Sequence, residues 1–390
     1  MAIGSAKKKP VITPVQLVLL SVGSSIMFPY TFMPVLRTPP ANQDSWIVSL
    51  LTFVYILILN APFLFLMNRF RGLSINEMAE TILGRVFGKL ACLIFIGLFL
   101  FCYAACMLMG AMFVNIFILQ ETPRWAILLY TAVPVVYAVY KGAGSIGRLA
   151  AFITPLVILT VIIFFLMGIK KMDFTILQPI LADSTVLELN QGAFLTASRY
   201  SEITILVVFS QFLRQKASVN KIYASALVLY GISFLLIVIP TVTVLGTDLA
   251  KHSWNPYFTY TRQVEAYDFI QRVQSINVVA WFMGMILKSS AYCYMASYVL
   301  SGVVKAKSHK PFIIPLSAAA LIVCMLPFMD KTTTIELLRS DRVFPWIVVA
   351  AVFVPSVIMA VVYFFRRKTV GMIVKQKLAA GTSAETEQEN

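Results

Sequence analysis

The stretch GAFLTASRYSEITILVVFSQFL, from Gly192 to Leu213, is the part of the sequence on which the fold prediction depends. It is long enough to cross a bilayer, because a spanning helix needs about 20 mostly apolar residues. Yet Arg199 and Glu202 lie near its middle, where a charge costs roughly 2.5–3.5 kcal/mol on insertion scales. Such charges persist where they face a cavity or a partner. The stretch therefore predicts one wall of a polar site inside a membrane. Arg199 and Glu202 are three residues apart on one helix face and are able to pair.

The composition around this stretch is that of a polytopic membrane protein. Apolar residues make up 59% of the 390 positions and charged residues 13%, whereas soluble domains contain about 25% charged residues. The net charge of +15 does not indicate nucleic-acid binding, because the basic residues are spread over the loops between apolar stretches instead of forming one patch.

The apolar stretches predict an all-α fold of ten transmembrane helices. Of the 32 Lys and Arg residues, 20 fall in segments on the side of the N-terminus and ten on the opposite side, which predicts that both termini are cytoplasmic. The expected organisation is a cytoplasmic segment 1–13, a ten-helix permease-like domain 14–367 and a cytoplasmic tail 368–390, disordered at its end. The expected spans are 14–36, 46–68, 90–119, 125–140, 149–169, 192–213, 221–246, 275–304, 311–328 and 343–365.

The first span carries signals of an interrupted helix. Pro29 cannot donate a hydrogen bond to the Ser25 carbonyl, and Gly23 and Ser24 come just before, near mid-depth. One interpretation is a simple proline kink. The other is an unwound segment at Gly23, Ser24 and Ser25 that offers backbone groups to a ligand. Because the first and the sixth of ten spans are both unusual, the pattern favours a LeuT-like fold of two five-helix inverted repeats.

The eighth span contains a second intramembrane cation. Lys288 lies near its centre, and a buried ammonium needs an acid partner to stay charged. Glu202 is the only acid within a predicted span, so we expect Lys288 to approach it, with Arg199 sharing the carboxylate. Two roles remain open for this cluster of charges: it holds helices six and eight together, or it gates a pathway. The polar residues nearby that are candidate ligand contacts are Tyr103, Ser198, Tyr200, Ser289 and Ser290.

Enzymatic and metal chemistry are not expected. All five cysteines fall inside apolar spans, and the two histidines, His252 and His309, lie in separate loops. The sequence contains no Ser/His/Asp or Cys/His set and no glycine-rich phosphate loop. We therefore expect no metal and no cofactor.

Short helices are predicted outside the spans. Ser74 and Glu77 have the spacing of a capping box, which predicts a helix on the cytoplasmic membrane surface. Asn255 before Pro256 predicts the start of a surface helix that leads into span eight.

Three motifs, in this order and at these separations, carry a resemblance that extends from about Val11 to Arg367. They are SSIMFP in span one, RYSEITILVVFSQFL in span six, and NPYFTYTRQVEAYDFIQRVQS followed by VVAWFMGMILKSS. The pattern resembles the B subunits of nutrient germinant receptors, the spore germination permeases of the amino acid–polyamine–organocation superfamily. The resemblance implies a LeuT-like fold in the spore inner membrane, partner A and C subunits, and a small nutrient ligand, an amino acid or a sugar. One departure is that Gly23 is followed by Ser24, where superfamily members often carry a glycine pair.

The sequence thus predicts a receptor subunit that binds a small nutrient midway through the membrane. The expected ligand contacts are Gly23, Ser24, Ser25, Tyr103, Ser198, Tyr200, Ser289 and Ser290, beside the charges of Arg199, Glu202 and Lys288. Two alternatives stay open: a proton-coupled amino-acid transporter with Glu202 as proton carrier, and a channel-like subunit that passes water or ions.

Overall fold

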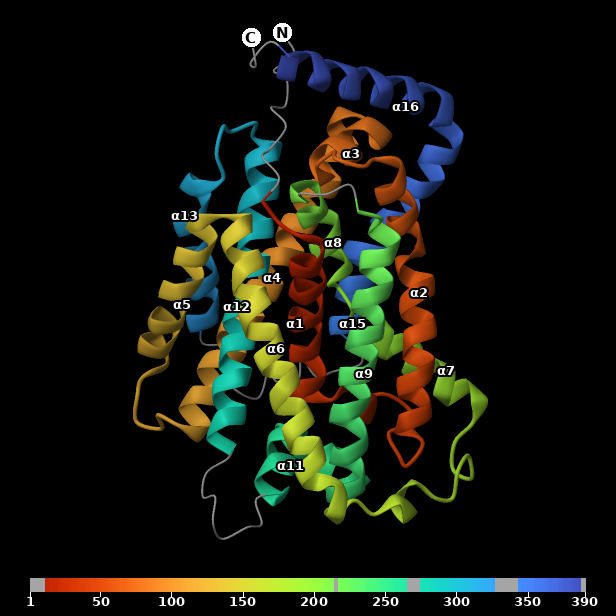
Figure 1. The fold of residues 1–390 in the computed structure, drawn as a ribbon, viewed down its shortest axis with the longest axis vertical. Helices are drawn as coiled ribbons and strands as arrows, with labels where there is room; N and C mark the ends of the chain where they lie inside the picture. The colour runs from red at the N-terminus through yellow and green to blue at the C-terminus, as the bar shows by residue number, and fades with distance from the viewer. Residues whose placement is uncertain (1–10, 214–216, 265–273, 327–342, 387–390) are drawn as a thin grey trace.

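The computed structural model describes residues 11–213, 217–264, 274–326 and 343–386, and these form an all-helical bundle (Figure 1). Seven stretches of helix are long and apolar enough to cross a membrane, which confirms the predicted class of fold. They contain α1 (Pro14–Phe32), α2 (Ser45–Arg69), α4 (Arg85–Phe117), α6 (Ala143–Gly168), α9 (Val219–Leu245), α12 (Gln274–Val303), and α15 (Phe344–Val348) with α16 (Val354–Thr386).

Shorter helices occupy the other three predicted spans. They are α5 (Arg124–Lys141), α13 (Lys310–Met325), and the pair α7 (Val186–Ala197) and α8 (Ile203–Phe209). The chain enters α1 and leaves through α16 at the same end of the bundle, the end at which α3 lies (Figure 1). The number of crossings and the cytoplasmic side remain predictions. Residues 368–386, assigned to a tail by the sequence, continue α16 as helix, and residues 387–390 lie outside the described residues.

Two short helices begin where their capping residues predict. Helix α3 (Ile75–Leu83) starts after Ser74, whose side chain accepts a hydrogen bond from the Glu77 amide, while the Glu77 carboxylate accepts from the Ser74 amide. Helix α11 (Pro256–Val264) follows Asn255, whose side-chain oxygen accepts from the Phe258 amide at 3.0 Å. Residues 265–273, which join α11 to α12, lie outside the described residues.

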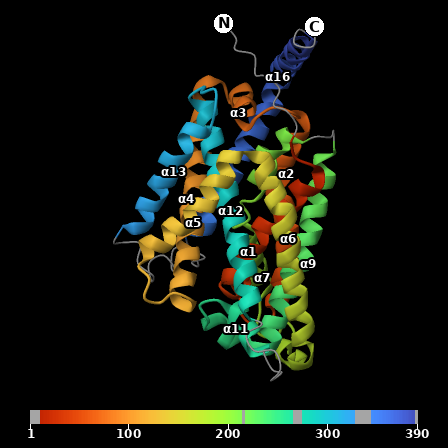
Figure 2. The ribbon, with the colours of Figure 1, turned by 60° about the vertical axis from the view of Figure 1, so that its left-hand side comes forward.

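The prediction that span one is unwound at Gly23, Ser24 and Ser25 is wrong. Helix α1 continues through all three residues and through Pro29, and it ends at Phe32, before Met33, which has a φ of 47°. Packing explains the continuity, because α1 is in contact with α6, α9 and α12 (Figures 1 and 2). Neighbouring helices that surround a proline can tolerate its missing hydrogen bond.

The interruption lies in span six instead. Helix α7 ends at Ala197, and α8 begins at Ile203. The five residues between them, Ser198 to Glu202, are joined by turns, such as the bond from the Tyr200 amide to the Ala197 carbonyl at 2.9 Å. We call this segment the span-six break. Arg199 and Glu202 therefore do not share a helix face, because neither is helical.

Gly23 has a packing role in α1. A Cβ atom built on Gly23 meets the Thr154 hydroxyl oxygen on α6 and lies 3.0 Å from a methyl carbon of Leu287 on α12. The Thr154 hydroxyl is fixed there, because it donates to the Leu19 carbonyl at 2.8 Å. The absence of a side chain at Gly23 thus lets three helices approach one another.

Replacing Gly23 with alanine should destabilise the bundle by about 1–3 kcal/mol, the usual cost of overpacking. The melting temperature of the detergent-solubilised protein would measure this. Gly97 on α4 is the matched control, because a Cβ built there meets nothing within 4 Å. An unchanged melting temperature for Gly23→Ala would contradict the close packing.

Candidate ligand-binding site

A cavity of about 50 Å³ lies between α1, α4, α12, α15 and the span-six break. Its charged lining consists of Arg199, Glu202 and Lys288, the three residues that the sequence singled out as an intramembrane cluster. Its hydroxyl groups come from Thr31, Ser201 and Tyr292. Most of the remaining lining is apolar and aromatic, including Met27, Phe28, Phe32, Met109, Met285 and Phe344.

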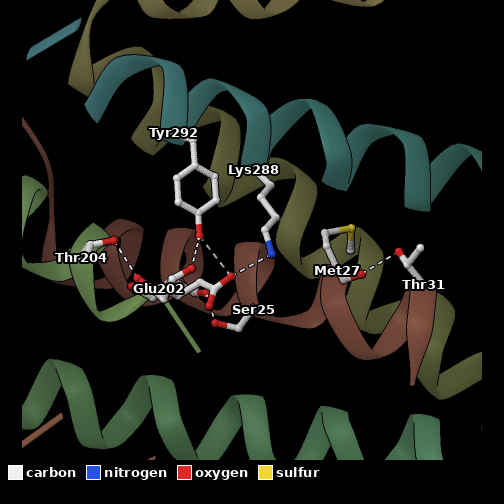
Figure 3. Close-up of polar contacts among 9 residues, drawn as sticks. Ser25, Met27, Thr31, Glu202, Thr204, Lys288 and Tyr292 are labelled. Carbon is white, nitrogen blue, oxygen red and sulfur yellow. Dashed lines mark hydrogen bonds and ion pairs between the residues drawn. The ribbon is translucent and has the colours of Figure 1, made fainter. Parts of the chain in front are cut away.

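An ion pair joins the span-six break to α12. The Lys288 ammonium lies 2.8 Å from the Glu202 carboxylate oxygen Oε1, and both residues are buried (Figure 3). The predicted contact between these two residues is therefore confirmed. Removing one partner of a buried pair typically costs 3–5 kcal/mol, because it leaves a buried charge uncompensated. The pair thus fixes the break against α12.

Tyr292 adds a second connection between the same elements. It lies one helical turn after Lys288, so both side chains point from α12 toward the break (Figure 3). Its hydroxyl lies 2.7 Å from the Ser201 hydroxyl and donates to Glu202 Oε1 at 3.4 Å. Glu202 thus receives both a charged and a neutral donor from one face of α12.

Arg199 reaches the same cavity from the break. Its guanidinium carbon lies 5.8 Å from the centre of the Phe28 ring, and the Lys288 ammonium lies 5.7 Å from that centre. Cations within about 6 Å of an aromatic ring are attracted by its electrons. Phe28, on α1, therefore contacts both cations of the site.

The side of the cavity toward α11 is closed by aromatic rings. Trp281 on α12 donates from its indole nitrogen to the Thr31 hydroxyl at 2.9 Å. The Phe113 ring lies 4.2 Å from the Trp281 ring and 5.2 Å from that of Phe258 on α11, centre to centre. A ligand entering from this side would have to displace these rings.

None of the eight predicted ligand contacts lines this cavity. Three serines donate instead to the carbonyl one turn earlier, as serines in transmembrane helices commonly do. These bonds run from Ser25 to Ser21, Ser198 to Phe194 and Ser290 to Ile286, at 2.7–2.8 Å. Of the predicted residues, the three charged ones thus line the cavity and the eight uncharged ones do not, and their roles in ligand binding stay predictions.

The other five predicted contacts serve packing or lie elsewhere. Tyr103 faces α13, where its hydroxyl lies 3.3 Å from that of Ser317, and the Tyr200 ring packs against Tyr230 at 5.6 Å. Gly23 packs against α6, and Ser24 is buried within α1. Ser289 borders a separate space of about 10 Å³ between α4, α5 and α12.

Sequence reasoning did not assign Ser201, Tyr292 and Phe28 to the site. The first two carried a usable signal, because Ser201 adjoins Glu202 and Tyr292 follows Lys288 by one helical turn. Phe28 carried none, since one of 29 phenylalanines in an apolar chain has no distinguishing context. Among the described residues, no group of three or more His, Cys, Asp and Glu side chains could hold a metal ion.

The fold and the site define a membrane protein of the transporter-fold class, with an interrupted sixth span and a buried ion pair beside a central cavity. The chain resembles the nucleobase-cation-symport-1 family transporter Mhp1 in its closed conformation, with a TM-score of 0.68 and 13% identity over 94% of this chain and 82% of that one. It also resembles MhsT in complex with L-phenylalanine, with a TM-score of 0.62 and 11% identity over 96% and 100% of the two chains. These likenesses confirm the LeuT-like fold.

The chain belongs to the spore germination protein family, whose sequence pattern matches residues 11–333. It is 22% identical to spore germination protein XB of Bacillus anthracis, over 81% of this chain and 88% of that protein. It is 24% identical to spore germination protein KB of Bacillus subtilis (strain 168), over 79% and 82% of the two chains. Family membership fits a multi-pass integral protein of the spore inner membrane.

Replacing Tyr292 with phenylalanine tests the second connection to Glu202. We expect a loss of about 1 kcal/mol of stability, because one hydroxyl and its hydrogen bonds disappear while the ring remains. Thermal unfolding in detergent measures the effect. Tyr294→Phe on the same helix is the control, because the described side-chain contacts of Tyr294 are made by its ring. Equal stability of the two variants would contradict a role for the Tyr292 hydroxyl.

Proposed function

We propose that this chain is the membrane-embedded B-type subunit of a nutrient germinant receptor and that it binds a small nutrient in the cavity beside Lys288 and Glu202. The observation that carries the proposal is the meeting of the ion pair, the span-six break and the cavity at one place. Membership of the spore germination protein family supports the biological role. Partner A and C subunits would then receive the signal.

The signal would be a change in the packing of the span-six break against α12. A ligand shifts an equilibrium between two conformations only by its difference in affinity for them. The break is held by Lys288, Tyr292 and Glu202, and these groups border the cavity. A bound carboxylate or ammonium group that competes for either charge changes the contacts of the break directly.

The cavity lining favours a small amino acid over a sugar. A sugar presents many hydroxyl groups, whereas the neutral hydrogen-bonding side chains of the lining are Thr31, Ser201 and Tyr292. These hydroxyls already bond to Trp281 or to one another. At about 50 Å³ the cavity has the volume of one or two water molecules, so an amino acid requires the lining to move. Methionines such as Met27, Met109 and Met285 suit this, because their side chains readily change rotamer.

Spores that lack this protein, screened against single amino acids and sugars, test the proposal. We expect loss of germination with one nutrient or a small set of nutrients and recovery on complementation. Purified protein should then gain thermal stability with that nutrient and not with its mirror-image form. Germination with every nutrient at the wild-type rate would contradict the receptor role.

A proton-coupled amino-acid transporter is the second candidate function. The observation that favours it is a buried carboxylate, Glu202, beside the cavity of a transporter fold. Uptake of labelled amino acid into proteoliposomes, driven by a pH gradient and lost in Glu202→Gln at an equal amount of folded reconstituted protein, would support it. Stereospecific binding without uptake would support the receptor.

A further inference from the structure

The small space that Ser289 borders lies directly beside the cavity, where α4, α5 and α12 pack against one another. Its volume is about 10 Å³, and its lining is mainly apolar, with Val135 and Phe282 among its members. Two residues, Cys106 on α4 and Met285 on α12, border both this space and the cavity. The side chains of these two residues therefore form the partition between the two spaces.

Gly110 leaves the second space open. It is buried within α4, yet a Cβ atom built on it meets no atom of the neighbouring elements within 4 Å. Carbon atoms in a packed protein interior lie about 3.5–4.0 Å apart, and voids there are few. A carbon atom thus fits beside Gly110 without a clash. Glycine inside a helix is also less favourable than alanine, so glycine at this position lowers stability in two ways.

Met285 is placed to use this space. Of the three methionines in the described lining of the cavity, it alone also borders the second space. Its side chain is unbranched and has three rotatable bonds, so its terminal methyl group changes position readily. Lys288 follows it by three residues, which places both on one face of α12 with their Cβ atoms about 5–6 Å apart. An amino acid whose charged groups meet Lys288 and Glu202 therefore brings its own side chain next to Met285.

We propose that Met285 and the space beside Gly110 set the size of the nutrient side chain that the cavity accepts. The terminal methyl group of Met285 turns into this space when an aliphatic side chain enters the cavity, and the volume that it vacates holds that side chain. The inference rests on the proposed function, the binding of an amino acid in this cavity. It also gives a reason for the packing defect, because stability is commonly lower where activity needs room to move.

Replacing Gly110 with alanine fills the space permanently, and the melting temperature of the purified full chain should rise. Spores carrying the variant are tested with glycine, L-alanine, L-2-aminobutyrate and L-norvaline, whose side chains lengthen by one carbon atom at each step. We consider the longest of these whose effect is lost in spores lacking this protein. Its concentration for half-maximal germination should rise at least tenfold in the variant, at equal protein abundance, and the shorter amino acids should be affected less.

Gly97→Ala is the matched control for this variant. Gly97 lies on the same helix, and a Cβ built there also meets nothing within 4 Å, but this residue is exposed on the outside of the bundle. Alanine at this position should leave the response to all four amino acids unchanged.

A double variant shows whether Met285 is the group that moves. In a Met285→Ala background, Gly110→Ala should change the half-maximal concentration less than twofold, because no methyl group then needs the space. Gly110→Ala alone decides the matter where the double variant is too scarce to measure. A tenfold effect in the Met285→Ala background, an unchanged response or a lower melting temperature in Gly110→Ala, or no germination with any of the four amino acids would each overturn the proposal.

Ala105→Leu separates this inference from the nutrient site itself, because Ala105 lines the cavity and not the second space. If Ala105→Leu weakens the response and Gly110→Ala does not, the inference is overturned while the nutrient site stands. If neither variant weakens the response, both are overturned.

Discussion

Replacing Glu202 with glutamine should destabilise the protein by about 3–5 kcal/mol and sharply reduce its abundance in membranes. The physical reason is that Lys288 then keeps a buried ammonium without its acid partner. Quantitative blotting of membranes and thermal unfolding in detergent would measure both effects. Glu121→Gln is the matched control, because Glu121 is exposed in the loop between α4 and α5.

A double variant separates a structural role of this pair from a functional one. Glu202→Gln with Lys288→Met removes both charges, and replacing a buried pair by groups of similar volume is often neutral or stabilising. We therefore expect abundance to recover while the nutrient response stays lost. Full response per molecule would show that the pair only holds the helices together. Normal stability of the single Glu202→Gln variant would contradict a buried ion pair.

Replacing Ala105 with leucine should abolish the nutrient response, or raise the nutrient concentration for half-maximal response at least tenfold, which corresponds to about 1.4 kcal/mol. Ala105 on α4 lines the cavity, and leucine adds three carbon atoms to a space of about 50 Å³. Germination rate against nutrient concentration, normalised to protein abundance, would measure the change.

Ala104→Leu is the matched control for this variant. Ala104 is the neighbouring residue, and its carbonyl accepts a hydrogen bond from the Cys324 thiol on α13 at 3.3 Å. It does not line the cavity. The control variant should retain the wild-type response once abundance is taken into account. An unchanged response in Ala105→Leu would place the nutrient elsewhere in the protein.

Sequence reasoning located the charges of the site because burial makes them costly. Glu202 is the only acid in the predicted spans, and Lys288 is one of two cations that lie away from the ends of those spans, so few pairings were possible, and the 2.8 Å contact followed. The same reasoning misplaced the helix interruption. Pro29 marked span one, but α1 packs between other helices and tolerates the proline, whereas span six is interrupted at Ser198 to Glu202 without proline or glycine. Helix propensity depends on the local sequence, so it does not predict where packing against neighbouring helices preserves a helix and where a helix is interrupted.

The sequence by itself determined the membrane class, the positions of the apolar helices and the contact between Lys288 and Glu202. The length of an apolar stretch is a local property of the sequence, and a buried charge has very few possible partners. Only the tertiary structure decided which neutral side chains reach the cavity. The hydroxyls of Ser25, Ser198 and Ser290 donate to carbonyls one turn earlier, whereas those of Ser201 and Tyr292 meet across two elements. Which side chains face the cavity depends on the rotation of each helix against its neighbours, and packing over the whole length of the helix sets that rotation.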